Sequence, residues 1–111
     1  MRAVVGQTGS FETLVAETDT AHALGNPGVH VLATPRLAGF CERAALDSGG
    51  SGGEPARRLR IDIRHLAPTP VGDRVEIVAE LVDILGERLV FEVDGRDSRG
   101  RIVSGRVELL G

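Results

Sequence analysis

Two residues of this chain, Glu42 and His65, carry side chains that can move protons and stand where the sequence pattern turns them inward. His65 follows Leu59, Ile61 and Ile63 at every second position, so it falls on the apolar face of a predicted strand. Glu42 falls within a predicted helix, away from its polar stripe. A carboxylate and an imidazole on elements that pack together provide the ingredients of an acid–base or water-activating site.

Each of these residues also has an ordinary structural interpretation. An inward-facing histidine is often only a satisfied core residue, and a carboxylate in the middle of a helix can simply pair with an arginine. Thr34 stands directly before Pro35 at a predicted helix start, where its hydroxyl is first explained as an N-cap. Thr34 nevertheless lies eight residues before Glu42, roughly 80° away around the helix at ~100° per residue. The two side chains could therefore border one pocket at different depths.

The segment from Pro35 to about Asp47 is predicted to be a helix enclosed by other elements. Its polar residues Arg36, Arg43 and Asp47 fall on one narrow stripe, and small or apolar residues cover almost all of the rest. A helix that is apolar around most of its circumference packs on several sides at once.

Alternation of apolar and polar residues predicts the strands. One strand is expected within residues 11–18, and a short helical turn should follow from Thr18 to Leu24. A glycine-rich loop is expected at 49–53. Four further strands should then follow, separated by tight hairpins at Gly86 and Gly100 and by a stiffer connection at 68–72; they are predicted at 58–64, 74–81, 89–94 and 103–109.

Short connections of this kind give antiparallel pairing, and a sheet with one apolar face must cover that face. The nearly all-apolar helix is the sizeable candidate for the cover. The pattern therefore predicts an α+β fold of the hotdog type, a five-stranded antiparallel sheet wrapped around a central helix.

Composition narrows the class of protein. With 41% hydrophobic and 26% charged residues, residues 1–111 should form one globular domain. A net charge of -3 and only three aromatic residues argue against nucleic-acid binding. The lone Cys41 excludes an internal disulfide, no pair of CxxC motifs offers a metal site, and no apolar run is long enough to cross a bilayer. We expect a cytoplasmic protein that binds neither metal nor membrane.

Three strings of residues resemble the fluoroacetyl-CoA thioesterase-like family of hotdog proteins. They are Val-Leu-Ala-Thr-Pro at 31–35, Glu-Arg-Ala-Ala at 42–45 and His-Leu-Ala-Pro-Thr-Pro-Val-Gly at 65–72, of which the last is the most specific. The likeness continues through 80–81 and 88–93, so it covers nearly all of the chain from Thr18 onward.

The resemblance implies a catalytic constellation of Thr34, Glu42 and His65 that hydrolyses an acyl thioester without a cofactor. In the roles expected here, Glu42 acts as nucleophile or general base, His65 passes a proton to the departing thiolate, and Thr34 positions the water or the carboxylate. Backbone N–H groups at the start of the helix could stabilise the oxyanion. The resemblance also implies a homodimer with sites at the subunit boundary.

Substrate contacts are expected from two groups of residues. A basic cluster either receives the phosphates of coenzyme A or is a solvated outer strand face; it consists of Arg57, Arg58, Arg60 and Arg64. Pro35 and Ala38, at the start of the predicted helix, should also line the substrate site.

Two departures from the family pattern affect the acyl group. Arg58 stands where the family usually has a glycine of the acyl pocket, and a large side chain there is expected to reshape that edge of the site. The segment 24–30 contains no aromatic residue shortly upstream of Thr34, so selectivity for fluoroacetyl groups is not expected. His22 and His30, in the same irregular region, are expected to be solvated or capping residues rather than metal ligands.

Two alternatives to hydrolysis stay open. A hotdog dehydratase would use the same histidine and carboxylate for proton abstraction. A non-catalytic accessory module would bind an acyl-CoA without turnover. The acyl carrier in each case is coenzyme A or a carrier protein.

Overall fold

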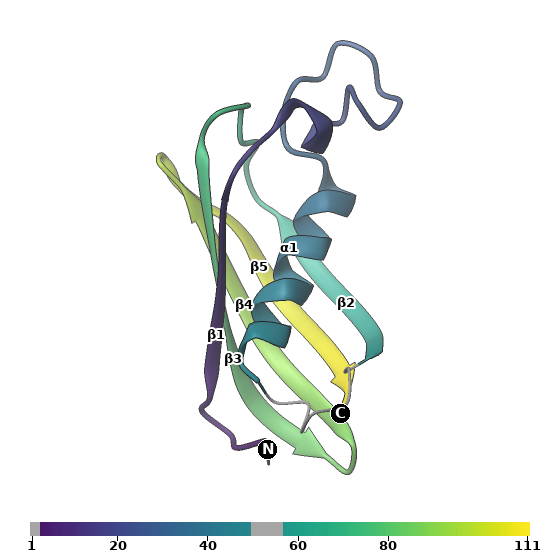
Figure 1. Ribbon diagram of the computed structural model, residues 1–111, viewed down its shortest axis with the longest axis vertical. Coiled ribbons are helices and arrows are strands. Elements are labelled where there is room, and N and C mark those ends of the chain that lie inside the picture. Colours follow the sequence, from purple (N-terminus) through teal and green to yellow (C-terminus); the bar gives the residue numbers. More distant parts are fainter. Residues whose placement is uncertain (1–2, 50–56) are drawn as a thin grey trace.

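The computed structural model describes residues 3–49 and 57–111, and the fold within them is a sheet with one long helix lying along a face (Figure 1). The elements, in chain order, are β1 (Thr8–Leu14), the short 3-10 helix η1 (Glu17–Asp19), α1 (Thr34–Asp47), β2 (Arg57–His65), β3 (Arg74–Leu85), β4 (Arg88–Asp97) and β5 (Gly100–Leu110).

The sheet is antiparallel throughout and has the strand order β1-β3-β4-β5-β2. Tight hairpins join β3 to β4 and β4 to β5, at the predicted Gly86 and Gly100, whose φ angles of +64° and +143° favour glycine. Strands β1 and β2 form the two edges. The predicted hotdog fold, with five strands and one helix, is confirmed.

The core lies between α1 and the sheet. Leu37, Cys41 and Ala44 of the helix are fully buried, and they face sheet residues such as Ile77 and Phe91, which are also fully buried. Burying a side chain of the size of Leu or Phe contributes about 1.5–3 kcal/mol. This one-sided packing fixes the orientation of α1 and thereby of the polar residues on its other faces.

The helix differs from its prediction in two respects. Ala33 occupies the N-cap position and no side chain caps the helix, so the predicted capping role of Thr34 is wrong. The expectation of a helix enclosed on several sides is also wrong for the single chain, because Thr34, Pro35 and Leu46 are exposed. One face of α1 stays open in the single chain.

Several predicted boundaries also differ. The first strand, expected within 11–18, spans Thr8–Leu14, and the helical turn expected to extend to Leu24 is only the short η1, followed by hydrogen-bonded turns. Residues 50–53 of the predicted glycine-rich loop lie outside the described residues. Each later strand is longer than its alternation pattern suggested.

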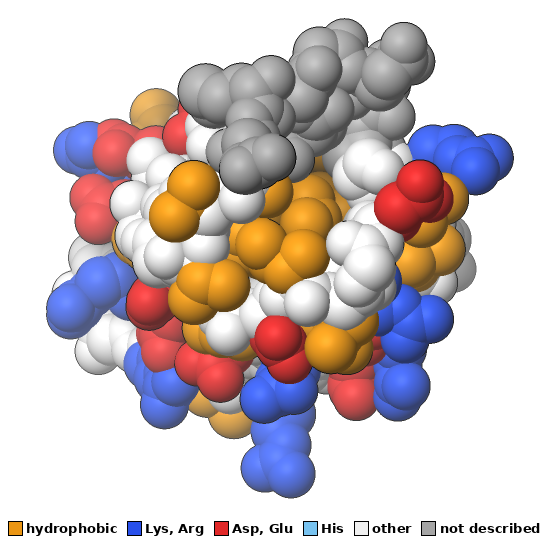
Figure 2. Space-filling view, turned by 90° about the horizontal axis from the view of Figure 1, so that it is seen from below, with side chains coloured by type: hydrophobic (Ala, Val, Ile, Leu, Met, Phe, Trp, Pro, Cys, Tyr) orange, Lys and Arg blue, Asp and Glu red, His pale blue; other side chains and the backbone are white. Residues whose placement is uncertain are grey.

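Apolar side chains gather at the end of the molecule that carries both termini (Figures 1 and 2). In Figure 2 they lie at the centre of this end, with charged side chains around them. Leu46, Leu59 and Leu85 are among the large apolar residues exposed in the chain, at 40%, 43% and 56%. No helix among the described residues is long and apolar enough to span a bilayer.

Candidate active site

Thr34 and His65 lie in direct contact where α1 begins and β2 ends. Thr34 Oγ1 and His65 Nδ1 are 2.8 Å apart and share a hydrogen bond. The flanking segments hold the pair in place, because the Leu32 N–H donates to the Thr69 carbonyl at 2.8 Å and Val31 forms a β-bridge with Pro70. The hydroxyl that the sequence assigned to capping therefore serves the histidine instead.

Of the two ring nitrogens of His65, Nδ1 contacts Thr34 and Nε2 does not. Its Nε2 is buried and has no hydrogen-bond partner among the described residues. Burial lowers the pKa of His65, because the interior disfavours the imidazolium, and the backbone of Ala67 opposes only part of this shift. The imidazole is therefore held neutral at physiological pH, and Nδ1 is the atom through which it can exchange a proton.

Glu42 lies further along α1 and pairs with Arg58 of β2. Arg58 donates from Nε and from Nη2 to Glu42 Oε1, at 2.9 and 2.6 Å. The carboxylate raises the pKa of Arg58 by hydrogen bonding and by its charge. The ordinary interpretation of a mid-helix carboxylate, an ion pair with an arginine, thus describes what Glu42 does in the single chain.

An irregularity in β2 brings Arg58 to the helix. Arg58 pairs with Leu109 and Arg60 with Glu108, so Leu59 is an extra residue in the ladder. Because of this bulge, Arg58 lies on the side of the sheet that faces α1, opposite the buried Leu109. The prediction that Arg58 shares one strand face with Arg60 and Arg64 is wrong.

The other predicted substrate contacts lie on two sides of β2. Arg60 and Arg64 lie on the face directed away from α1, and Arg60 pairs with Asp62 at 3.4 Å. Pro35 is exposed at the start of α1, and Ala38 is half-buried one turn before Glu42.

The two polar pairs lie along one seam between α1 and β2. Glu42 follows Thr34 by eight residues, which is about 12 Å along the axis at ~1.5 Å per residue. Among the described residues, no hydrogen bond joins Glu42 to Thr34 or to His65. The structure therefore brings Thr34 and His65 together and places Glu42 apart from them, beside Arg58.

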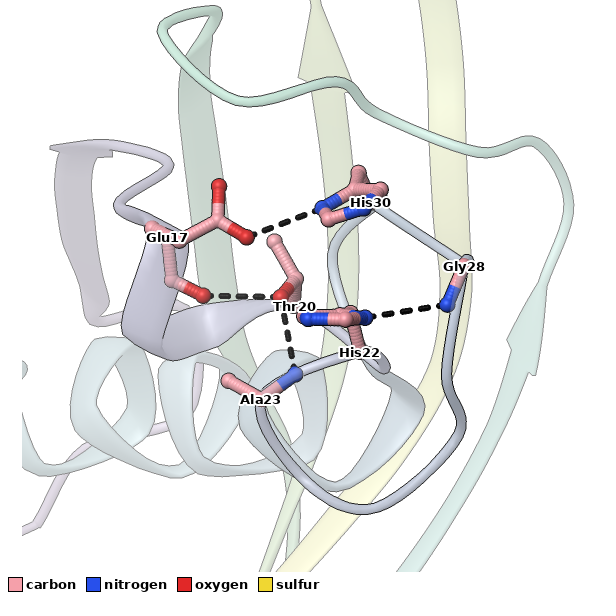
Figure 3. A network of polar contacts seen from close by, with 6 residues as sticks. All are labelled: Glu17, Thr20, His22, Ala23, Gly28 and His30. Atoms are coloured by element: carbon pink, nitrogen blue, oxygen red, sulfur yellow. Dashed lines mark hydrogen bonds and ion pairs between the residues drawn. The ribbon is translucent and has the colours of Figure 1, made fainter.

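The two other histidines hold the segment that precedes α1 (Figure 3). His22 and His30 stack with their ring centroids 4.2 Å apart. His22 Nδ1 accepts the Gly28 N–H at 2.9 Å, and His30 Nδ1 lies 2.9 Å from Glu17 Oε1. Their contacts are those of loop-stabilising residues, and the described part of the chain contains no group of three or more residues placed to bind a metal.

A cleft of about 430 Å³ lies on the face of the sheet opposite to α1. Charged side chains line it, and they largely pair with one another: Arg106 lies 3.6 Å from Glu92, and Arg101 pairs with Asp94. The Thr34–His65 pair is not part of this cleft.

Comparison with known proteins shows which family the chain matches. The model of the fluoroacetyl-CoA-specific thioesterase family matches residues 15–109. No curated protein sequence matches at a significant level.

Solved structures agree with the family match. A point mutant of the fluoroacetyl-CoA-specific thioesterase FlK, in complex with fluoroacetate and CoA, superposes with a TM-score of 0.87 at 28% identity, over 96% of this chain and 93% of that one. A thioesterase superfamily member from Thermus thermophilus has a TM-score of 0.88 at 29% identity, over 99% and 85%. A hot-dog-like protein from Thermanaerovibrio acidaminovorans, 20% identical with a TM-score of 0.85 over 97% and 82%, shares the fold. The chain therefore belongs to the fluoroacetyl-CoA-specific thioesterase family, and it is a thioester hydrolase.

Proposed function

We propose that the protein hydrolyses the thioester of a small acyl-CoA at a site made by Thr34, Glu42 and His65. The observation that carries this proposal is the 2.8 Å contact between Thr34 Oγ1 and His65 Nδ1 at the open end of the α1–β2 seam. The FlK relative that binds CoA supports a CoA thioester as substrate. An acyl-carrier protein is the alternative donor.

His65 acts in proton transfer. Because its imidazole is neutral, it can accept a proton at Nδ1 as the tetrahedral intermediate forms and return it to the thiolate as that intermediate breaks down. Thr34 lies within hydrogen-bond distance of the same nitrogen, so its hydroxyl can orient the attacking group or relay the proton. The net reaction consumes one water and yields a carboxylic acid and a thiol.

Glu42 supplies the carboxylate, as general base toward water or as nucleophile. In either role it must reach the thioester carbon, so the substrate must lie along the seam between Thr34 and Glu42. Arg58 holds Oε1 of this carboxylate and leaves Oε2 without a hydrogen bond among the described residues. Oε2 is therefore the oxygen that can take a proton or attack.

The start of α1 can stabilise the developing oxyanion. Thr34 and Arg36 donate no N–H bond within the helix, in contrast to Leu37, whose N–H donates to the Ala33 carbonyl. Unpaired N–H groups at a helix start, together with the positive end of the helix dipole, attract a negative oxygen.

Homodimerisation completes the proposal. Strand β2 is a sheet edge, and the face of α1 that carries Pro35 and Leu46 is exposed. An unpaired edge beside a partly apolar face is suited to pairing with a second copy. Arg60 and Arg64, on the face of β2 directed away from α1, are the other proposed contacts for the phosphates of coenzyme A. A cytoplasmic location fits the single buried thiol of Cys41.

Thiol release from acyl-CoAs with short, branched and aromatic acyl groups tests the proposal. Glu42→Gln and His65→Ala should each lower kcat/KM by on the order of 10²-fold or more, because each removes a proton-transfer group. Burial raises the pKa of the Cys41 thiol to about 12, so the protein itself should add little to a thiol readout.

The alternatives give different outcomes in the same assay. A dehydratase would change the acyl chain without releasing thiol, and an accessory module would bind acyl-CoA without either change. Turnover close to normal in both variants would remove Glu42 and His65 from the mechanism.

A further inference from the structure

Glu42 occupies only one of the two hydrogen-bonding edges of the Arg58 guanidinium. An arginine carries five N–H groups on two edges, and Glu42 Oε1 engages Nε and Nη2 on one of them. Nη1 makes no hydrogen bond or ion pair among the described residues. The second edge, formed by Nη1 and the outer N–H of Nη2, has the geometry that binds a carboxylate or phosphate through two parallel bonds.

The exposure of the pair shows which partner is accessible. The side chain of Arg58 is 57% exposed, whereas that of Glu42 is only 18% exposed. The guanidinium therefore lies over the carboxylate on its solvent side. A molecule that enters the seam near Glu42 meets the cation of Arg58 before it meets the carboxylate.

The residues of α1 one turn from Glu42 offer no second charge at this point of the seam. One turn to either side of Glu42 stand Ala38 and Leu46, neither of which can compete for an anion. The bulge at Leu59 turns Arg58 toward α1, because regular alternation would place Arg58 on the other face of the sheet.

We propose that Arg58 is an anion-binding subsite of the active site and that it determines substrate preference. Its Glu42 edge keeps the catalytic carboxylate in place, and its second edge binds a carboxylate or phosphate group of the substrate. This inference rests on the proposed hydrolysis and names its substrate class: an acyl thioester that carries an oxyanion in reach of β2.

Two parts of the substrate can supply that oxyanion. The acyl chain supplies it if it ends in a second carboxylate, and coenzyme A supplies it through its phosphates. A factorial experiment separates them: a neutral acyl group is compared with a carboxylate-terminated one of equal length, each carried by coenzyme A and by N-acetylcysteamine, which has no phosphate. Thiol release gives kcat/KM for the wild-type protein and for Arg58→Ala.

The expected result is a preference in the wild type that Arg58→Ala loses, by about 10- to 100-fold in the ratio of kcat/KM values, the usual worth of a charge-assisted contact. Loss of preference for the carboxylated acyl group on both carriers identifies the acyl chain. Loss of preference for coenzyme A over N-acetylcysteamine with both acyl groups identifies the phosphates. Ratios that are unchanged in Arg58→Ala overturn the subsite.

Two further variants test whether the effect depends on the position of Arg58 and on its guanidinium group. Arg101→Ala is the matched control, because Arg101 is also 57% exposed and also pairs with a carboxylate, that of Asp94, but on the opposite face of the sheet; it should leave every ratio unchanged. Arg58→Lys should retain only part of the preference, because an ammonium keeps the charge without the paired N–H groups. Wild-type protein that releases no thiol from any of the four substrates refutes the hydrolysis itself, whereas hydrolysis with unchanged ratios refutes only the subsite.

Discussion

At the scale of single residues, the two ring nitrogens of His65 have different surroundings. Nδ1 lies 2.8 Å from the Thr34 hydroxyl, and Nε2 is buried with no hydrogen-bond partner in the part of the chain that the structure describes. A second proton on this half-buried ring would place a charge that is only partly solvated, which disfavours the imidazolium. The contact with Thr34 is therefore the ring's route for proton exchange.

This asymmetry predicts the pH dependence of hydrolysis. Burial lowers the pKa of His65 below its ordinary value near 6.5, so the neutral imidazole persists to lower pH. The value of kcat/KM should stay on its plateau above pH 6.5 and fall only as the pH drops through the lowered pKa of His65. A pH–rate profile, with an NMR titration of the His65 ring, checks this. An acidic limb centred at or above 6.5 would contradict it.

Thr34 also shows what a local sequence pattern misses, although the family resemblance did place it beside His65 in one site. Thr before Pro is a sound capping signal, and the helix does begin there. The hydroxyl does not cap the helix, however, because it hydrogen-bonds to His65, which is 31 residues away along the chain. Such a contact depends on tertiary packing, which no local pattern encodes.

At the scale of elements, the contact between β1 and α1 is close to the limit of backbone approach. A Cβ atom added at Gly9 would lie 2.2 Å from the Ala44 carbonyl oxygen and 2.4 Å from the Ser48 nitrogen. These are backbone atoms of the helix and its C-cap, so no side-chain rotation can relieve the overlap. The missing side chain allows the strand to approach the helix that carries Glu42.

We expect Gly9→Ala to destabilise the protein by about 1–3 kcal/mol, the usual cost of overpacking. Gly39→Ala is the matched control, because a Cβ there meets nothing within 4 Å and the helix should gain about 0.5–1 kcal/mol from the better helix former. Denaturant unfolding of both variants measures the difference. Equal effects of the two substitutions would contradict the close approach.

The elements themselves were largely predictable, because strands with one buried face alternate and the helix buries a broad apolar surface. The bulge in β2 was not. Its local sequence has no glycine or proline that would indicate a bulge, and the adjacent pair Arg57 and Arg58 is the single sign that alternation fails. The face to which Arg58 points follows from pairing with Leu109, which only the folded sheet reveals.

At the scale of the whole molecule, the charges on β2 constrain how two copies can meet. Arg60, Asp62 and Arg64 alternate along its outer face, and β2 is an edge of the sheet. Antiparallel pairing of two β2 strands about Ile61 or Ile63 would set Asp62 opposite an arginine of the second copy. Pairing about Asp62 itself would oppose two carboxylates and is disfavoured.

The expected mass in solution is about twice 11.7 kDa, measured by light scattering or sedimentation. Asp62→Arg should shift the equilibrium toward the single chain, because it leaves only positive charges on the outer face of β2, and added salt should partly reverse the shift. Glu80→Arg, on the interior strand β3, is the control and should leave the mass unchanged. A fully active single chain at assay concentration would refute the dimer proposal.

The bulge also means that β2 has a second pairing available. Sliding its first residues by one position would set Leu59 against Leu109 and turn Arg58 outward, so the strand would bury a leucine that is now 43% exposed. The observed register forgoes that apolar contact and keeps a cation over Glu42. We therefore expect Glu42→Leu to favour the regular alignment of β2, because the cation of Arg58 then loses its partner on the helix.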